Sequence, residues 1–206
     1  MSKYELYVLD TETCGLNPNI HEPVEISIYR HSTGAQKTWH CKPINMDTIS
    51  PDALRVNGLK LEDLQGKTKE GREKYQEPSK VLVEIENWLA EDMVASEDRI
   101  MVGQNVSFDK LMLESLWDKC GALETFPFNK KYIIDTMQIE FMMDYIGQNE
   151  SEGYSLYALT KKYAIKNEKA HSAASDVLAT LGVFNKQVDH LRKKFKTNED
   201  PIRSRK

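Results

Sequence analysis

The segment VLDTETCGL, residues 8–16, places two carboxylates at the end of an apolar run. Asp10 and Glu12 lie two positions apart, and the Thr-Cys-Gly and Asn-Pro-Asn sequences that follow them are typical of turns. The pattern predicts a buried strand over residues 4–10 that ends near Glu12. Open α/β sheets bind their ligands at the carboxyl ends of strands. The position of the two acids therefore indicates a functional site.

The spacing of Asp10 and Glu12 favours a cation between their side chains. Successive side chains of a strand point to opposite faces, so these two acids share a face at a backbone separation of about 6.5–7 Å. Two carboxylates this close repel each other, and a divalent metal ion removes the conflict. Oxygen-only ligands suit Mg²⁺ or Mn²⁺. The alternative is an exposed pair of acids beside a loop, and the D-x-E spacing alone does not exclude it.

The rest of the chain alternates between strand and helix patterns. A second strand over 24–29 and a third over 36–41 are separated by Ser-Thr-Gly, which predicts a hairpin. Residues 66–78 are polar and predict a solvated loop. The order of elements predicts a mixed α/β sheet covered by helices. The remaining expected elements are strands over 99–102 and 132–135 and helices over 52–57, 79–92, 108–119, 136–145, 154–163 and 173–191.

Composition predicts one globular domain. The chain has 206 residues, of which 40% are hydrophobic and 29% charged, and this is enough to bury a substantial core. The three cysteines are widely spaced and lack a C-x-x-C pairing, which favours reduced thiols. The first residues do not resemble a signal peptide, and no apolar run reaches the length of about 18–20 residues that a bilayer requires. We therefore expect a cytoplasmic protein without a membrane partner.

Charge is unevenly distributed along the chain. The formal net charge is −4, yet residues 191–206 contain seven Lys or Arg against two acids. A basic tail of this kind can bind phosphates, although a solvated, frayed terminus is the simpler interpretation. We expect the folded domain to comprise residues 1–190 and the tail residues 191–206.

Two later segments carry acids that could join the first pair. GQNVSFD, residues 103–109, places Asp109 in the first turn of a helix that Asn105 could cap. AHSAASD, residues 170–176, carries His171 and Asp176. On one continuous helix, these two residues would point about 140° apart. They can share a site only if His171 precedes the helix and Asp176 faces inward from its first turns.

Taken together, D-x-E on a first strand, N-x-x-F-D at a strand-to-helix junction and H-x-A-x-x-D on a late helix resemble one family. They are similar to the three motifs of the DEDDh class of 3′→5′ exonucleases, which includes proofreading epsilon subunits, exonuclease I and exodeoxyribonuclease X. The resemblance covers residues 4–190 and also includes ISPDALRVNGL (49–59) and YSLYALTKKYAI (154–165). It implies a ribonuclease-H-like fold, a mixed five-stranded sheet flanked by helices. Three ordered motifs are far more specific than one.

The resemblance also implies roles for the motif residues. Asp10, Glu12, Asp109 and Asp176 would bind two divalent ions, Mg²⁺ or Mn²⁺. His171 would act as the general base, and 5′-mononucleotides would be released from the 3′ end of single-stranded DNA. Contacts to the terminal nucleotides would come from Thr11, Thr13, Leu16, Asn57, Asn105 and Phe108. Core packing is an equal alternative for Leu16.

Three other functions stay open at this point. An exoribonuclease of the same class differs in whether its site admits the 2′-hydroxyl, which sequence does not reveal. A non-catalytic nucleic-acid-binding module would be expected to have lost some of the acids, and ribonuclease H itself lacks the D-x-E spacing and the motif histidine. Binding of a polymerase or another protein to the chain also stays open. We interpret Asp135 as a helix cap or a support for the metal site, and Trp39, Trp88 and Trp117 as core residues.

Overall fold

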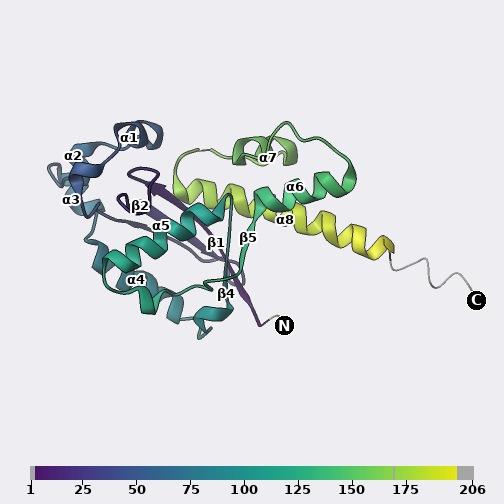
Figure 1. Cartoon of the computed structure of the whole chain (residues 1–206), viewed down its shortest axis with the longest axis horizontal. Coiled ribbons are helices and arrows are strands. Elements are labelled where there is room, and N and C mark those ends of the chain that lie inside the picture. The colour runs from purple at the N-terminus through teal and green to yellow at the C-terminus, as the bar shows by residue number, and fades with distance from the viewer. Residues whose placement is uncertain (1–2, 169, 199–206) are drawn as a thin grey trace, which may run out of the picture.

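A five-stranded mixed sheet forms the centre of the fold in the computed structural model, which describes residues 3–168 and 170–198 (Figure 1). The strand order is β3-β2-β1-β4-β5, with β1 in the middle. β1 pairs antiparallel with β2 and parallel with β4, β2 pairs antiparallel with β3, and β4 pairs parallel with β5. This is the predicted ribonuclease-H-like sheet. The strands are β1 (Glu5–Thr13), β2 (Pro23–Arg30), β3 (Gln36–His40), β4 (Arg99–Gly103) and β5 (Ile133–Asp135).

Eight α-helices are found in the described part of the chain, and most agree with the predicted segments. Short 3₁₀ turns lie at Met46–Thr48, Ser96–Asp98 and Leu123–Thr125. None of the described helices has the length and apolar character needed to cross a bilayer. The helices are α1 (Pro51–Asn57), α2 (Leu61–Leu64), α3 (Lys69–Lys74), α4 (Pro78–Ala90), α5 (Val106–Lys119), α6 (Thr136–Gly147), α7 (Leu156–Tyr163) and α8 (Ala173–Asn198).

The alternation of side chains along β1 divides the core into two layers. Tyr7 and Leu9 are fully buried on the face covered by α4 and α5. Val8 is buried on the opposite face, against Val177 and Phe184 of α8. Asp10 and Glu12 continue the even-numbered series, so they project on the α8 face. The face of the sheet on which the acids lie therefore follows from their even-numbered positions on β1.

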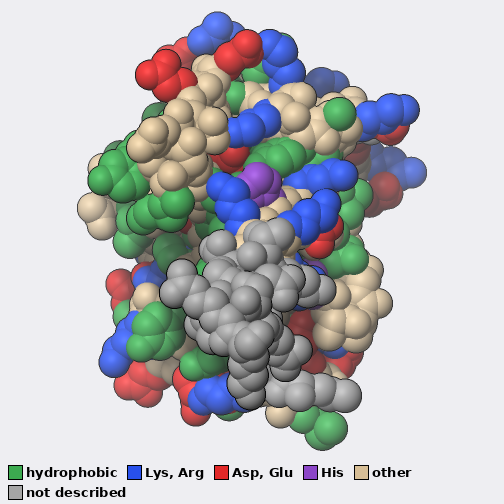
Figure 2. All heavy atoms as spheres, turned by 90° about the vertical axis from the view of Figure 1, so that its right-hand side faces the viewer, with side chains coloured by type: hydrophobic (Ala, Val, Ile, Leu, Met, Phe, Trp, Pro, Cys, Tyr) green, Lys and Arg blue, Asp and Glu red, His purple; other side chains and the backbone are tan. Residues whose placement is uncertain are grey.

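Two predicted segments differ in the structure. Residues 66–78 contain helix α3, which begins where the Thr68 hydroxyl accepts the backbone N–H of Gly71, so this segment is not a plain loop. Helix α8 continues past its predicted end at residue 191 to Asn198. The first half of the basic segment is thus helical, and residues 199–206 of the predicted tail lie outside the described residues. Figure 2 shows the face seen from the right-hand side of Figure 1, on which Lys and Arg side chains are interspersed with Asp and Glu side chains.

The predicted core tryptophans are largely inside. Trp39 and Trp117 are buried, and Trp88 is partly buried against the same layer. Trp39 and Trp88 make an edge-to-face contact with ring centroids 5.6 Å apart. Leu16, in contrast, is 79% exposed, so the core alternative for this residue is wrong.

Candidate active site

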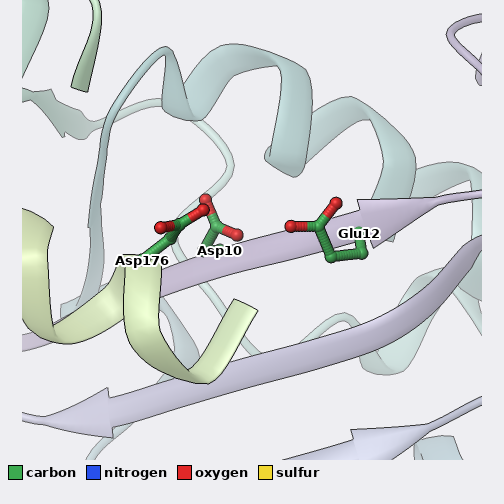
Figure 3. Close-up of side chains that lie close together, drawn as sticks. All are labelled: Asp10, Glu12 and Asp176. Carbon is green, nitrogen blue, oxygen red and sulfur yellow. The ribbon is translucent and has the colours of Figure 1, made fainter. Parts of the chain in front are cut away.

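Three carboxylates from two distant parts of the chain meet at the carboxyl end of β1. Asp10 and Glu12 project from β1, and Asp176 projects toward them from α8 (Figure 3). One carboxylate oxygen from each residue lies within 4.8 Å of the others. Glu12 and Asp176 are each 9% exposed. This cluster is the oxygen-rich arrangement that binds a hard divalent cation.

The start of α8 explains how Asp176 reaches β1. The helix begins at Ala173, and His171 precedes it in the left-handed region with φ 67°. The backbone N–H groups of Ser175 and Asp176 both donate to the Ser172 carbonyl. Ala173 is fully buried, so its small side chain lets the helix approach the sheet closely. The required arrangement, His171 on the loop and Asp176 facing inward from the first turn, is confirmed.

The electrostatics of the cluster favour a bound cation. Burial raises the pKa of Asp10 well above its usual value, and the carboxylates of Asp109, Asp176, Glu12 and Glu25 raise it further. Burial, followed by the charges of Asp176, Glu25 and Asp109, raises the pKa of Glu12 to about 8. A divalent ion would reverse both effects by neutralising the repulsion. The donor set therefore fits a hard metal ion.

Asp109 lies at the edge of this cluster, on the α5 side of β1. Its Oδ1 accepts two hydrogen bonds from Thr11, one from the backbone N–H at 2.9 Å and one from the hydroxyl at 2.8 Å. Thr11 has odd parity on β1 and so faces α5, opposite to Asp10. Burial raises the pKa of Asp109 to about 7, although the bonds from Thr11 oppose the shift. Asp109 is outside the three-carboxylate group.

His171 is exposed at the mouth of a cavity beside the acids. The cavity has a volume of about 550 Å³ and is also lined by Tyr157, Ile165 and Asp176. The backbone N–H of His171 donates to Oδ2 of Asp176 at 3.2 Å. The loop that carries the imidazole is therefore tied to one of the three acids.

The residues expected to contact the terminal nucleotides lie around the end of β1, but several of their groups already have partners. The Thr13 hydroxyl donates to the Gly15 carbonyl, and the Asn57 side-chain amide donates to the Thr13 carbonyl at 3.1 Å. The Thr11 N–H is bonded to Asp109. Exposed Leu16 and half-buried Phe108 retain open surface.

Two capping predictions have different outcomes. Asn105 occupies the residue before α5, but its side chain forms no capping hydrogen bond and its backbone is left-handed with φ 57°. The predicted Asn105 cap is wrong, because that conformation turns the side chain away from the helix. The Asp135 side chain accepts the N–H groups of both Asn105 and Met137, so the helix-cap interpretation is confirmed.

Two residues that hold the site together were not predicted from the sequence. Glu25 of β2 lies opposite Glu12 in the strand register, 3.4 Å from His40 Nε2 and 3.3 Å from the Ser172 hydroxyl. Burial alone would raise the pKa of Glu25, but the bond with His40 and the charges of His40 and Lys74 lower it. Asn167, on the loop before α8, bonds to Asp176. The alternation of β2 could have revealed Glu25, whereas nothing local to Asn167 revealed its partner.

Comparisons with known proteins agree with this geometry. The chain is 28% identical over 187 residues to a DNA polymerase III PolC-type of Thermotoga maritima, covering 90% of this chain and 12% of the relative. It thus spans about one eighth of the length of that protein. An exonuclease I from E. coli in complex with single-stranded DNA matches with a TM-score of 0.70, 20% identity, and coverage of 94% of this chain and 42% of the other. Exonuclease I of Methylocaldum szegediense matches with a TM-score of 0.69 at 18% identity over 93% and 41%.

A family model also matches most of the chain. The exonuclease family RNase T matches residues 7–184, a span that contains Asp10, Glu12, Asp109, His171 and Asp176. The two exonuclease I structures support the same fold at low sequence identity. The chain therefore belongs to the RNase T family of exonucleases.

Proposed function

We propose that this chain is a metal-dependent 3′→5′ exonuclease that hydrolyses single-stranded DNA and releases 5′-mononucleotides. The observation that carries the proposal is the group of three unneutralised carboxylates at the end of β1, with His171 on the adjoining loop. Membership of an exonuclease family gives the reaction class. Residues 1–190 would form the catalytic unit, with residues 191–206 as a basic extension.

Two divalent ions, Mg²⁺ or Mn²⁺, are the proposed cofactors. When bound, such ions stabilise charge on the attacking and leaving oxygens of a phosphodiester. Asp10, Glu12 and Asp176 would hold them directly, since their oxygens converge. Asp109 would act from the edge of the group, where Thr11 fixes one of its oxygens and leaves the other available.

His171 would accept the proton of the attacking water. An imidazole suits this task, because its unperturbed pKa of about 6.5 lies close to neutral pH. His171 is exposed and lines the same cavity as Asp176, which supports this role. We expect His171→Ala to lower turnover at neutral pH by orders of magnitude, and unchanged turnover would exclude this role.

Similarity to DNA-acting proteins supports DNA as the substrate. The structural neighbours include exonuclease I bound to single-stranded DNA, and the curated relatives are DNA polymerases. Leu16 and Tyr157 are exposed and Phe108 is half-buried, so these side chains offer apolar surface for bases. Stacking on aromatic rings tolerates any sequence, as repeated removal of single nucleotides requires.

Incubation with end-labelled polymers tests the proposal. Single-stranded DNA, duplex DNA and RNA of the same sequence would be labelled at either end and incubated with Mg²⁺, Mn²⁺ or EDTA. We expect immediate release of labelled mononucleotide from the 3′ label, a shortening ladder from the 5′ label, and no reaction in EDTA.

The same assay separates the alternatives. Cleavage of RNA in preference to DNA would identify an exoribonuclease instead. Binding without cleavage of any polymer, in either metal, would favour a non-catalytic nucleic-acid-binding module. Asp10→Asn serves as the inactive control, and the exposed substitution Asn149→Leu serves as a control that leaves the site intact.

A further inference from the structure

The loop between α7 and α8 sends one amide side chain into the acidic group. Asn167 Nδ2 donates to Oδ1 of Asp176 at 2.6 Å, and Asn167 Oδ1 accepts the Ser175 hydroxyl at 2.7 Å. Asn167 is half-buried. The amide therefore bridges the acid of α8 and a neighbouring hydroxyl of the same helix turn.

Charge fixes the orientation of this amide. A carboxylate accepts hydrogen bonds and cannot donate them, so the group 2.6 Å from Asp176 Oδ1 must be the NH₂ end of Asn167. The opposite orientation would place a carbonyl oxygen against a carboxylate oxygen. The Ser175 hydroxyl can donate, and it satisfies the carbonyl end that faces it.

With the bond from Asn167, each oxygen of the Asp176 carboxylate accepts one hydrogen bond. Oδ1 accepts the Asn167 amide, and Oδ2 accepts the backbone N–H of His171. With one donor on each oxygen, rotation about the last side-chain bond is restricted. Each oxygen still has a lone pair for a cation, because a carboxylate oxygen offers about two acceptor positions.

We propose that Asn167 is a positioning residue, which holds the Asp176 carboxylate in the orientation that binds a divalent cation with Asp10 and Glu12. The inference rests on the proposed function, since it assigns a role at the same site. Groups that hydrogen-bond to ligating carboxylates determine ligand orientation, and their loss costs about 10–100-fold in metal affinity or activity. The charge-assisted geometry at 2.6 Å belongs to the strong class of hydrogen bonds.

A direct Mn²⁺ titration of the full chain, without nucleic acid, tests the inference. Asn167→Leu keeps the size of the side chain but removes the donor, and we expect it to weaken Mn²⁺ binding by about 10–100-fold in calorimetry. Asn167→Gln retains an amide donor on a side chain one methylene longer and should recover part of the affinity. Ser175→Ala removes only the group that fixes the amide, so its effect should be smaller than that of Asn167→Leu. Asn149→Leu, at an exposed position, should match the wild type.

Two readouts separate positioning from simple support of the fold. The midpoint of unfolding in EDTA reports the contribution of Asn167 to stability. In the cleavage assay, Asn167→Leu should require a higher Mn²⁺ concentration than the wild type, and its turnover should recover at saturating Mn²⁺. A lower midpoint with unchanged Mn²⁺ affinity in both Asn167 variants would overturn the inference.

The outcomes also distinguish this inference from the proposed function. If the wild type binds Mn²⁺, Asn167→Leu weakens that binding and neither protein cleaves any polymer, the exonuclease proposal alone would be refuted. An active enzyme whose Mn²⁺ affinity is insensitive to Asn167→Leu would refute the inference alone. Absence of Mn²⁺ binding in the wild type would refute both.

Discussion

Two groups of buried acids lie on the same side of the sheet, and their partners differ. Between α6, α7 and α8, Glu140 is fully buried and accepts bonds from Lys162 at 2.6 Å, Tyr163 at 2.7 Å and Gln187 at 2.8 Å. Asp144, 3% exposed, bonds to Lys162 and to the Ser151 hydroxyl. We call these two acids the paired group. We call Asp10, Glu12 and Asp176 at the end of β1 the unpaired group, because no lysine or arginine of the described residues forms an ion pair with them, although Asp176 accepts hydrogen bonds from Asn167 and His171.

The pKa directions of the two groups express this difference. Burial would raise the pKa of Asp144, but bonds from Ser151 and Lys162 outweigh burial and lower it. At Asp10, burial raises the pKa and every neighbouring carboxylate raises it further. Buried charges persist in proteins when they are paired or when they coordinate a metal. The paired group therefore serves the fold, and the unpaired group is left for a ligand.

The largest expected difference is in activity. Asp10→Asn should lower the rate of nucleotide release by several orders of magnitude, because it removes a carboxylate that would hold the proposed cations. In EDTA the same variant should unfold at a higher temperature than the wild type, because a source of repulsion is gone. Cleavage assays and thermal melts measure the two effects. Retained cleavage, or a lower melting temperature in EDTA, would contradict the assignment of Asp10 to an unpaired cation site.

The paired group should respond in the opposite sense. Lys162→Met leaves Glu140 and Asp144 without their cation, and we expect a loss of about 1–3 kcal/mol in the free energy of unfolding, discounted because the lysine side chain is 39% exposed. Activity per folded molecule should stay unchanged. Urea denaturation in EDTA and a cleavage assay of the folded variant test this. A stable variant that had lost cleavage would place Lys162 in the active site instead.

The difference between the two groups of acids could be predicted only where it depends on residues close together in the sequence. The unpaired acids of β1 were predictable, because strand parity alone puts Asp10 and Glu12 on one face. The pairing of Glu140 was not, since its partners Lys162, Tyr163 and Gln187 come from two helices whose packing is decided by the tertiary structure. The start of α8 was correctly predicted, but its predicted end at residue 191 was too early, because Leu191 and Phe195 continue the helical spacing of apolar residues toward Asn198.

The site itself was predictable in part for the same reason. His171 was expected before the helix, because a single helix could not direct both His171 and Asp176 inward. In the structure, His171 lies before α8 with a left-handed backbone of φ 67°. Asp109 lies apart from the three-carboxylate group because it bonds to Thr11, whose odd-numbered position on β1 faces α5. This separation could not be predicted from the sequence, which does not reveal which helix covers which face of the sheet. Asn167 makes a contact nine residues along the chain, across a loop that has no sequence periodicity.

The pH dependence of stability should also differ in sign between the groups. The folded-state pKa of Glu12 is about 8 against an ordinary value of 4.5, so the folded protein binds a proton more tightly than the unfolded chain. Stability in EDTA should therefore fall as pH rises from about 5 to about 8, and Mg²⁺ should restore it. The lowered pKa of Asp144 acts the other way, and its contribution is lost only as pH falls below the ordinary value of 3.8.

Urea midpoints across this range, with and without Mg²⁺, measure the effect. Glu12→Gln should flatten the decline above about pH 5, because the titrating carboxyl is gone. A decline of unchanged slope in Glu12→Gln would assign the titration to other groups. A wild type whose stability in EDTA rises over the same interval would contradict the unpaired state of the cluster.

The smallest expected effect compares two exposed tyrosines, one beside each group. Tyr157 is 80% exposed and lines the cavity that contains His171 and Asp176, whereas Tyr145, 76% exposed, follows Asp144 on α6. If nucleic acid binds only at the unpaired group, Tyr157→Ala should weaken single-stranded DNA binding by the about 1–3 kcal/mol of one stacked base. Tyr145→Ala should leave binding unchanged. Fluorescence anisotropy with a labelled oligonucleotide measures the affinity of both variants, in the presence of Ca²⁺, which binds oxygen ligands. Equal losses of affinity would show that the nucleic acid also contacts the paired group.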